Sequence, residues 1–543
     1  MYIRIRLSRF NLSLHVMFYR IQYAKANRWE PPIDLASQMF SNGSFQATAF
    51  GPCCPQRNTG IYIPLQDEQC LYLNIFTPLN KPNESLLPIL VWVHGGGLTS
   101  GCSSQSIPIL YNGTNIIANS PQQPIIIVTI NYRLGILADM YLTELIEENS
   151  EWPTAGNYNY LDILSALRWI NINIRDYGGN PNNVLLFGES SGGKAVVDVG
   201  ALKGSSNLYQ HIISQSGGFS SSIFYSNMSS AVEKSNTIVE QMNCTNHKSK
   251  LLLTCLRNSS IQDLIIAYGN RPSKSVIDGY FFLYYPPLAI QNGKYNQNIS
   301  MIIGANKYEE PYYPIFPEMN SEFAVSIITG ILGQNRAPTA INYYQLNHCS
   351  SNANATNRCC DMTRTAINTL IGCSIRRVYD NIYLKYNQEQ HKLFWYNMDC
   401  NPGICPELSK EEGAGLCLHA SELPLVFGTE SDYRSMNPVN CTWDNQTRTY
   451  SNQIILHWVS MATKGEPLKQ WPTYDPSTSK YLQLTPYHEF SVESWNYDCS
   501  IFDQIEQDDL SEMFGNSSPC EYRNAYSSAC FVILLLIFYH HHL

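Results

Sequence analysis

VLLFGESSGG, residues 184–193, joins an apolar run to a Gly-x-Ser-x-Gly pattern. The run ends at Phe187 and has the composition of a buried β-strand, and residues 195–197 can continue as a helix. A serine on such a sharp strand-to-helix turn has a strained backbone and a projecting hydroxyl, and only glycine fits on either side of it. The free N–H groups of the following helix favour negative charge there. The pattern predicts a nucleophilic Ser190, and an ordinary glycine-rich βα loop is the alternative.

Other apolar runs extend this prediction to the whole chain. Continuous apolar strands are typical of a parallel sheet that is covered on both faces. Strands that alternate with helices predict an α/β fold, a mostly parallel central sheet with helices on both faces. A helical period covers residues 160–174. The expected strands are residues 71–76, 89–93, 124–130, 184–187, 212–217, 301–304 and 392–396.

A serine nucleophile needs a base, and the base needs an acceptor that fixes its tautomer. In enzymes with this strand–turn–helix serine, the acid and then the histidine follow it along the chain. Residues 301–310 (MIIGANKYEE) place Glu309 and Glu310 after a strand, and residues 415–423 (GLCLHASEL) place His419 in a loop. The pattern alone does not decide between the two carboxylates. The alternative for each residue is an ordinary surface or loop position.

A glycine-rich turn supplies candidate donors for an oxyanion. His94-Gly95-Gly96-Gly97 follows the strand expected at residues 89–93. Glycine there lets backbone N–H groups approach a developing negative charge, and the N–H after the nucleophile completes the hole. A flexible turn is the alternative interpretation.

The composition limits the partners. The 543-residue chain has 44% hydrophobic residues and a formal net charge of −9. No basic run offsets the acidic balance, which excludes nucleic acid as an expected partner. The 17 cysteines do not form paired Cys-x-x-Cys knuckles, so no metal is expected. Without internal repeats or a long linker, one catalytic domain over residues 18–502 is the simplest partition.

Cysteines and glycosylation sequons favour the secretory route. Residues 1–17 lack an apolar core and a cleavage site, and we interpret them as an atypical or misplaced N-terminus. A polar spacer over residues 503–528 precedes an apolar tail over residues 529–543, the arrangement of a GPI-anchor signal. A short membrane anchor or a packed terminal strand is the alternative. The sequons begin at Asn42, Asn83, Asn112, Asn227, Asn243, Asn258, Asn298, Asn354, Asn440, Asn445 and Asn516.

Taken together, the ordered motifs resemble the type-B carboxylesterase/cholinesterase family of α/β-hydrolases. The resemblance covers residues 18 to 502, nearly the whole expected mature chain. The motifs are DEQCLYLNIFTP (67–78), VHGGG (93–97), NYRLG (131–135), GNYNYLDILSALRWI (156–170), FGESSGG (187–193), SQSGG (214–218), IGANKYEE (303–310) and HASELPLVFG (419–428).

The resemblance implies a role for each matching residue. It implies Ser190 as nucleophile, Glu309 rather than Glu310 as acid, and His419 as base, with no cofactor. It implies oxyanion donors at Gly96, Gly97 and Ser191. It also implies disulfides Cys244–Cys255, Cys54 (or Cys53)–Cys70, and Cys373 with a late cysteine, Cys499.

Several positions depart from the family pattern. Arg20 replaces a glycine, Tyr308 and Glu310 replace the residues beside the acid, and Lys194 replaces a small residue. A cation in the first turn after Ser190 opposes the helix dipole, and burial would depress its pKa. The loop between Cys54 and Cys70 lacks the tryptophan that cholinesterases place over a quaternary ammonium. This absence disfavours acetylcholine and leaves neutral carboxylic esters.

The sequence therefore predicts a serine carboxylesterase that acts on a small-molecule ester. It is expected to be secreted or at the cell surface, with membrane attachment through the tail. The alternative is a non-catalytic cholinesterase-like surface or adhesion protein, but such members typically lose a triad residue and this chain keeps all three. A lipase for long acyl chains would share the chemistry and differ only in its pocket.

Overall fold

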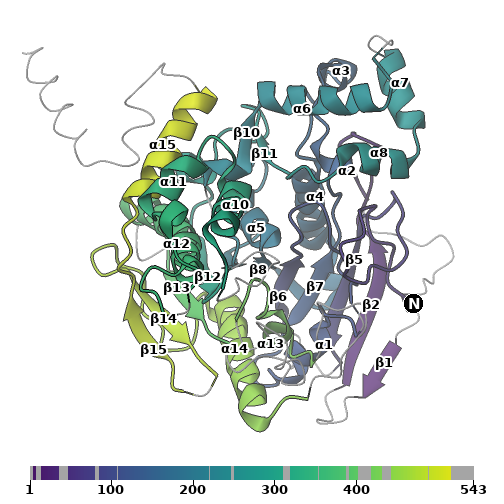
Figure 1. Cartoon of the computed structure of the whole chain (residues 1–543). Coiled ribbons are helices and arrows are strands. Elements are labelled where there is room, and N and C mark those ends of the chain that lie inside the picture. The colour runs from purple at the N-terminus through teal and green to yellow at the C-terminus, as the bar shows by residue number, and fades with distance from the viewer. Residues whose placement is uncertain are drawn as a thin grey trace, which may run out of the picture.

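A computed structural model gives the fold of the chain (Figure 1). It describes residues 4–7, 14–35, 47–79, 85–106, 108–218, 221–245, 250–309, 318–352, 354–386, 391–400, 417–430, 442–486 and 488–514. Glu310, the tail predicted as a GPI signal (529–543), and the sequons at Asn42, Asn83, Asn440 and Asn516 lie outside these ranges.

The predicted α/β fold is confirmed, and an 11-stranded sheet forms its centre. The strand order is β1-β2-β5-β7-β6-β8-β9-β12-β13-β14-β15. All neighbours from β7 to β14 are parallel, whereas the pairs at the two ends are antiparallel. The sheet strands are β1 Arg4–Leu7, β2 Leu14–Gln22, β5 Tyr72–Pro78, β6 Leu87–Val93, β7 Ile126–Ile130, β8 Gly179–Glu189, β9 His211–Gln215, β12 Ser300–Asn306, β13 Leu393–Met398, β14 Lys480–Leu484 and β15 Ser491–Ser494.

Helices and two small sheets complete the described structure. The small sheets pair β3 (Ala24–Lys25) with β4 (Ile33–Asp34), and β10 (Tyr225–Asn227) with β11 (Ser275–Ile277). The helices are α1 Gly113–Ala118, α2 Ile136–Asp139, α3 Thr143–Glu148, α4 Tyr158–Asn173, α5 Ser191–Asp198, α6 Met228–Gln241, α7 Lys250–Asn258, α8 Ile261–Tyr268, α9 Pro286–Gln291, α10 Ser321–Leu332, α11 Ala337–Tyr343, α12 Cys359–Lys385, α13 Leu423–Phe427, α14 Asn445–Lys464 and α15 Ser500–Phe514.

Helices cover both faces of the sheet because the central strands are apolar on both sides. In β6, Ile89 and Val91 belong to one core, and Leu90 and Trp92 belong to the other. Successive side chains of a strand point to opposite faces, so a continuous apolar run fills two cores at once. Helices α4, α5 and α12 pack in the first core and α1, α13 and α14 in the second. Figure 1 shows α13 and α14 near the bottom of the view, with α4 and α5 higher.

Three terminal elements extend the folded region beyond residues 18–502. Strands β1 and β2 pair with the sheet although they begin before residue 18. Helix α15 continues past residue 502 to Phe514, into the segment predicted as a polar spacer, and buries Phe502, Ile505 and Leu510 in the core. None of the helices that the structure describes is long and apolar enough to cross a membrane.

Six disulfides lie in the described part of the chain. They include the three expected pairs, with Cys54 rather than Cys53 as the partner of Cys70. The others were not anticipated. The bonds are Cys53–Cys102, Cys54–Cys70, Cys244–Cys255, Cys349–Cys359, Cys373–Cys499 and Cys400–Cys417.

Candidate active site

Ser190 occupies the sharp turn between β8 and α5. Its φ of 55° and ψ of −126° lie outside the regions that a non-glycine residue ordinarily adopts. Its backbone N–H donates to the carbonyl of Gln215 at 2.8 Å. A Cβ on Gly188 or Gly192 would come within 2.6 Å or 2.1 Å of backbone atoms, so only glycine fits at either position. The fold therefore holds the strained turn that the sequence pattern predicted.

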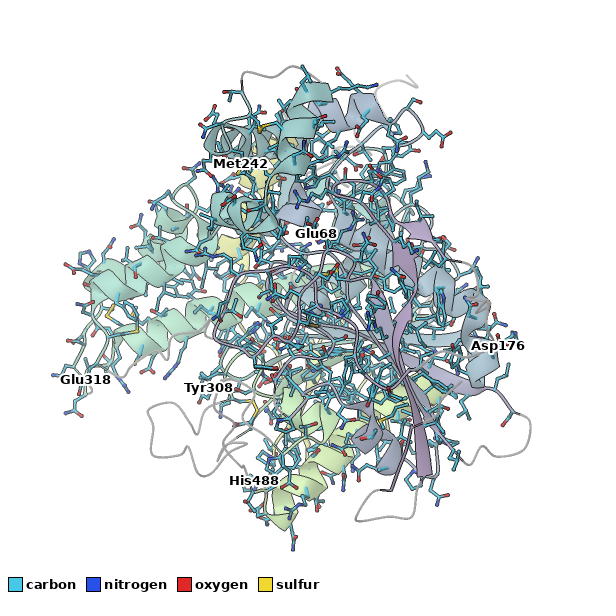
Figure 2. The ribbon with its side chains drawn as sticks, turned by 90° about the vertical axis from the view of Figure 1, so that its right-hand side faces the viewer. Glu68, Asp176, Met242, Tyr308, Glu318 and His488 are labelled. Carbon is cyan, nitrogen blue, oxygen red and sulfur yellow. A yellow bond between two sulfur atoms is a disulfide. The ribbon has the colours of Figure 1, made fainter. Side chains whose placement is uncertain are left out.

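Three side chains from distant loops form one hydrogen-bond chain. Nε2 of His419 lies 2.8 Å from Oγ of Ser190, and Nδ1 of the same ring lies 2.5 Å from Oε2 of Glu309. His419 precedes α13 and Glu309 follows β12. The region of the acid can be found in Figure 2 from the label of Tyr308, the residue before Glu309. This label lies between Glu318 near the left edge of the view and Asp176 near the right edge. The structure thus brings the predicted nucleophile, base and acid into the order that proton transfer requires.

The acid is anchored by two further donors. Oε1 of Glu309 accepts from the hydroxyl of Ser216 and from the backbone N–H of Asn306, each at 2.5 Å. The Glu309 side chain is fully buried, so these bonds replace its lost hydration. The side-chain amide of Asn306 also donates to the carbonyl of Leu418 at 2.8 Å. Asn306 therefore joins the loop of the acid to the loop of the histidine.

A second carboxyl group lies beside the histidine. Oε1 of Glu189 is 3.3 Å from Nε2 of His419. Burial lowers the pKa of His419, but Glu189 and Glu309 outweigh this effect and raise the pKa to about 10. Burial raises the pKa of Glu189 well above its ordinary value, and it raises the pKa of Glu422, also close to Glu309, to about 7. The site thus favours a positive charge on the histidine, the charge it acquires when it accepts a proton.

The glycine turn lies against the serine. A Cβ on Gly95 would be 3.1 Å from Cβ of Ser190, which shows how closely the two segments approach. Gly96 and Gly97 have φ values of 112° and 65°, and within the described residues neither N–H has a hydrogen-bond acceptor. The backbone N–H of Leu98 donates to Oγ of Ser191 at 3.0 Å and holds the turn on the start of α5. The candidate oxyanion donors Gly96, Gly97 and Ser191 line the same cavity as Ser190.

His94 supports this turn. Its ring stacks on Tyr132, with centroids 4.4 Å apart, and burial lowers its pKa to about 4. The Tyr132 hydroxyl donates to the His94 carbonyl at 2.5 Å. A neutral, stacked His94 is a structural part of the turn and carries no charge near neutral pH.

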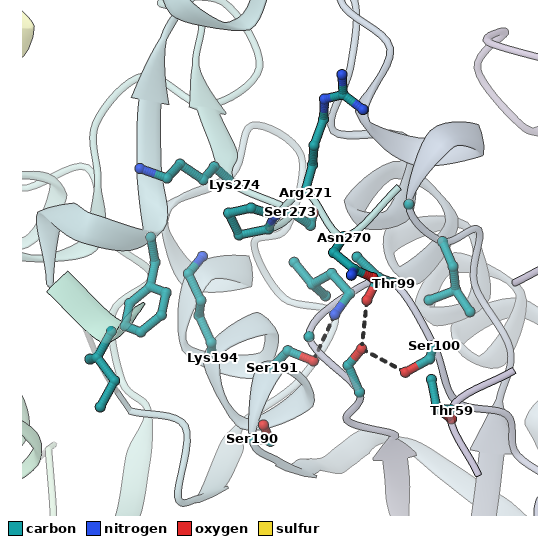
Figure 3. Close-up of a pocket in the computed structure, with 18 of the residues that line it drawn as sticks. Thr59, Thr99, Ser100, Ser190, Ser191, Lys194, Asn270, Arg271, Ser273 and Lys274 are labelled. Atoms are coloured by element: carbon teal, nitrogen blue, oxygen red, sulfur yellow. Dashed lines mark hydrogen bonds between the residues drawn. The ribbon is translucent and has the colours of Figure 1, made fainter. Parts of the chain in front are cut away.

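A cavity of about 710 Å³ opens beside the serine. Ser190, His419 and the glycine turn line it together with apolar side chains of α8, α10 and α12. This volume is in the usual range for a small-molecule site. Figure 3 shows Lys194 and Ser191 near Ser190 on the wall of the cavity.

Lys194 belongs to a buried polar cluster. Its Nζ contacts the carboxylate of Asp198 and lies 2.7 Å from Oγ of Ser275 and 4.1 Å from the ring centre of Tyr225. Tyr160 also donates to Asp198. Burial lowers the pKa of Lys194, and Asp198 opposes that shift. An acid four residues along the helix thus compensates the cation that departs from the family pattern.

Ser216, Asn306 and Glu189 are site residues for which the sequence predicted no role. All three lie inside quoted motifs (SQSGG, IGANKYEE and FGESSGG), which was the available signal. Their contacts with Glu309 and His419 depend on the meeting of distant strand ends. Within the described ranges, no group of three or more His, Cys, Asp or Glu is placed to hold a metal ion.

Comparison with known proteins places this site in a family. The model of the carboxylesterase family matches residues 6–500. Carboxylesterase 1C of Rattus norvegicus is 29% identical over an alignment of 456 residues, which covers 78% of this chain and 74% of the relative. Para-nitrobenzyl esterase of Bacillus subtilis is 27% identical over an alignment of 461 residues, which covers 81% of this chain and 84% of the relative. Acetylcholinesterase of Bungarus fasciatus is 27% identical over an alignment of 482 residues, which covers 81% of this chain and 74% of the relative.

Proposed function

Since this chain belongs to the carboxylesterase family and is a carboxylic ester hydrolase, we propose that it acts through Ser190, His419 and Glu309. The observation that carries the proposal is the continuous hydrogen-bond chain from Glu309 through His419 to Ser190. A hydroxyl becomes a competent nucleophile when a correctly oriented base removes its proton.

The reaction proceeds in two half-reactions. Oγ of Ser190 attacks the ester carbonyl while His419 takes its proton, and the tetrahedral intermediate collapses as His419 returns that proton to the leaving alcohol. Water then attacks the acyl-enzyme with His419 as base and releases the acid. Glu309 fixes the ring tautomer and stabilises the imidazolium. No cofactor enters any of these steps.

The oxyanion of each tetrahedral intermediate lies on backbone donors of Gly96, Gly97 and Ser191. All three residues line the same cavity as Ser190, and within the described residues the N–H groups of the two glycines have no acceptor, which supports this assignment. The N–H of Ser191 is at the first position of α5, where no intrahelical acceptor exists. Removal of one such donor typically costs about 10²–10³ in turnover.

Labelling with a fluorophosphonate tests the nucleophile. We expect one covalent adduct on the folded protein, located at Ser190 by peptide mass spectrometry, and none on Ser190→Ala. Ser206→Ala is the matched control, because Ser206 is exposed and its hydroxyl donates to the side chain of Asn296, away from the triad. Absence of an adduct on the folded wild type would contradict the proposal and favour the non-catalytic surface protein.

We further propose that the protein is secreted and glycosylated. Six disulfides fit an oxidising compartment. The sequon asparagines at Asn243, Asn258, Asn298, Asn354 and Asn445 are exposed and accessible to a glycan. A mass decrease on treatment with an N-glycosidase tests the glycans. Release from cells by a phosphatidylinositol-specific phospholipase tests the GPI anchor predicted from the tail. If the protein stays on the cells after this treatment, the result favours the alternative of a short membrane anchor.

A further inference from the structure

The cavity is lined by an excess of positive charge. Five cationic side chains reach its wall, whereas Glu309 is the one carboxylate among the described lining residues. Glu309 is already engaged with His419. The whole chain has a net charge of −9, so the sign of the cavity is opposite to that of the protein. The cations are Arg57, Lys194, Arg271, Lys274 and Arg336.

Two of these cations are neutralised by buried acids. Lys194 pairs with Asp198, and Arg336 pairs with Asp509. The side chains of the two acids are 0% and 3% exposed. Each pair contributes little net charge to the cavity, and neither cation is available to a ligand.

The other three have no carboxylate within ion-pair distance in the part of the chain that the structure describes. Arg57 is exposed and donates to the side-chain oxygen of Asn270. Arg271 donates to the carbonyl of Tyr268 at 2.7 Å, at the end of α8, and to Oγ1 of Thr237 at 3.1 Å. All these acceptors are uncharged, so the charge of both guanidinium groups persists.

Lys274 differs from the two arginines because its charged group has no hydrogen-bond acceptor among the described residues. It is half-buried, and within the described residues its ammonium has no hydrogen bond and no ion pair. Burial lowers its pKa and Arg336 adds to this effect, while Asp509 opposes it. A cation that is partly withdrawn from water without a partner costs free energy, which an incoming anion would recover.

Lys274 and the nucleophile Ser190 lie at opposite ends of the cavity. Figure 3 shows Lys274 and Arg271 at the top of the cavity, Ser190 at the bottom and Lys194 between them. A ligand bound to Lys274 can therefore extend toward the serine along the cavity. The volume of about 710 Å³ admits a molecule with two functional groups.

We propose that the substrate is a small carboxylic ester that also carries a carboxylate, and that this carboxylate binds Lys274 while the ester lies at Ser190. The inference rests on the proposed function and adds the substrate class. It differs from the neutral esters expected from the sequence, because the charge of the cavity depends on residues that the motifs do not include. Arg271 adds a second positive charge at the same end of the cavity.

A series of matched esters tests the proposal. Monomethyl esters of the linear diacids from succinate to suberate are compared with neutral methyl esters of the same chain length, for example monomethyl adipate with methyl hexanoate. Release of acid is followed in a pH-stat at low ionic strength. Wild type is expected to have a higher kcat/KM for the best diacid ester than for its neutral partner.

Variants of Lys274 assign the effect to the residue. Lys274→Gln should lower kcat/KM for the preferred diacid ester about tenfold, the loss expected for one hydrogen bond to a charged group. It should leave the neutral partner within about twofold, and Lys274→Arg should retain most of the preference. Lys392→Gln is the matched control, because Lys392 is 40% exposed, pairs with Glu466 and lies outside the cavity lining.

The outcomes separate this inference from the proposed function. If wild type hydrolyses the neutral esters in a Ser190-dependent way but prefers none of the diacid esters, the inference is wrong and the esterase mechanism stands. Equal losses for both esters in Lys274→Gln would also overturn it. If no ester of either series is hydrolysed, the proposed function fails and the inference fails with it. A phosphate monoester analogue that inhibits more strongly than the corresponding dicarboxylate would replace carboxylate by phosphate as the recognised anion.

Discussion

Glu309→Gln is the substitution that most directly tests the arrangement of the triad. The Glu309 carboxylate accepts three hydrogen bonds: Oε1 from the hydroxyl of Ser216 and the N–H of Asn306, and Oε2 from His419. A glutamine has the same shape but only one acceptor oxygen. If that oxygen faced His419, the new NH2 group would meet the backbone N–H of Asn306, and two donors would oppose each other in a buried site.

The glutamine oxygen must therefore remain on the Asn306 side, which turns the NH2 group toward His419. Nδ1 of His419 then becomes an acceptor, and the ring proton moves to Nε2. A proton on Nε2 prevents the ring from accepting the proton of Ser190, 2.8 Å away. Serine-hydrolase triads with this wrong tautomer lose about 10⁴ in kcat. The loss corresponds to about 5.5 kcal/mol in the activation free energy.

The assay is steady-state hydrolysis of a neutral methyl ester, with the rate of fluorophosphonate labelling as a second measurement. Both rates should fall together, whereas KM should change little because Glu309 does not bind the ester directly. Glu318→Gln, the same change at an exposed glutamate nine residues along the chain, should retain wild-type rates. A Glu309→Gln protein that keeps more than about one tenth of the wild-type kcat would refute the tautomer argument.

Three further predictions follow from the same structure. Glu189→Gln removes a carboxyl group that raises the pKa of His419. The acid limb of the pH profile of kcat/KM reports the formation of the neutral imidazole, so this limb should move to lower pH, toward the ordinary pKa of 6.5. An acid limb at the same pH as in wild type would contradict this prediction. Lys194→Met leaves Asp198 buried without its cation and should cost about 3–5 kcal/mol of stability, seen as a lower thermal midpoint and partly restored by adding Asp198→Asn. Arg20→Gly relieves the strain of a φ of 58° at an exposed residue, so it should raise the midpoint of thermal unfolding and increase the free energy of unfolding by up to about 1 kcal/mol. A lower thermal midpoint would show that the contacts of the Arg20 side chain outweigh its backbone strain.

Local backbone chemistry explains why much of the fold could be predicted from sequence. The residues that form the turn at Ser190 lie within three positions of it, so one short motif contains all of them. The apolar runs of β6 and β7 lie close to their expected bounds because strands that are buried on both faces contain few polar residues to interrupt the run. The helix predicted over residues 160–174 corresponds to α4.

Contacts between distant segments could not be predicted in the same way. The hydroxyl of Ser216 meets Glu309 across 93 residues of sequence, and only the parallel pairing of β9 with β12 brings them together. Pattern alone also left Glu309 and Glu310 equivalent, and the family resemblance was needed to choose. The positive charge of the cavity in this acidic chain could not be predicted either, because Arg57 and Lys274 lie in segments far apart along the sequence.

The spacing of the disulfides has a consequence for the order in which the protein is made. Five of the six bridges join cysteines that are 10, 11, 16, 17 or 49 residues apart. On the proposed secretory route, each of these can close on the growing chain soon after its second cysteine enters the oxidising lumen. Cys373 is different, because its partner Cys499 is translated 126 residues later. During that interval Cys373 has an open thiol in the segment of α12 that also holds Cys360, so among the described cysteines this segment has the longest time in which a wrong pair could form.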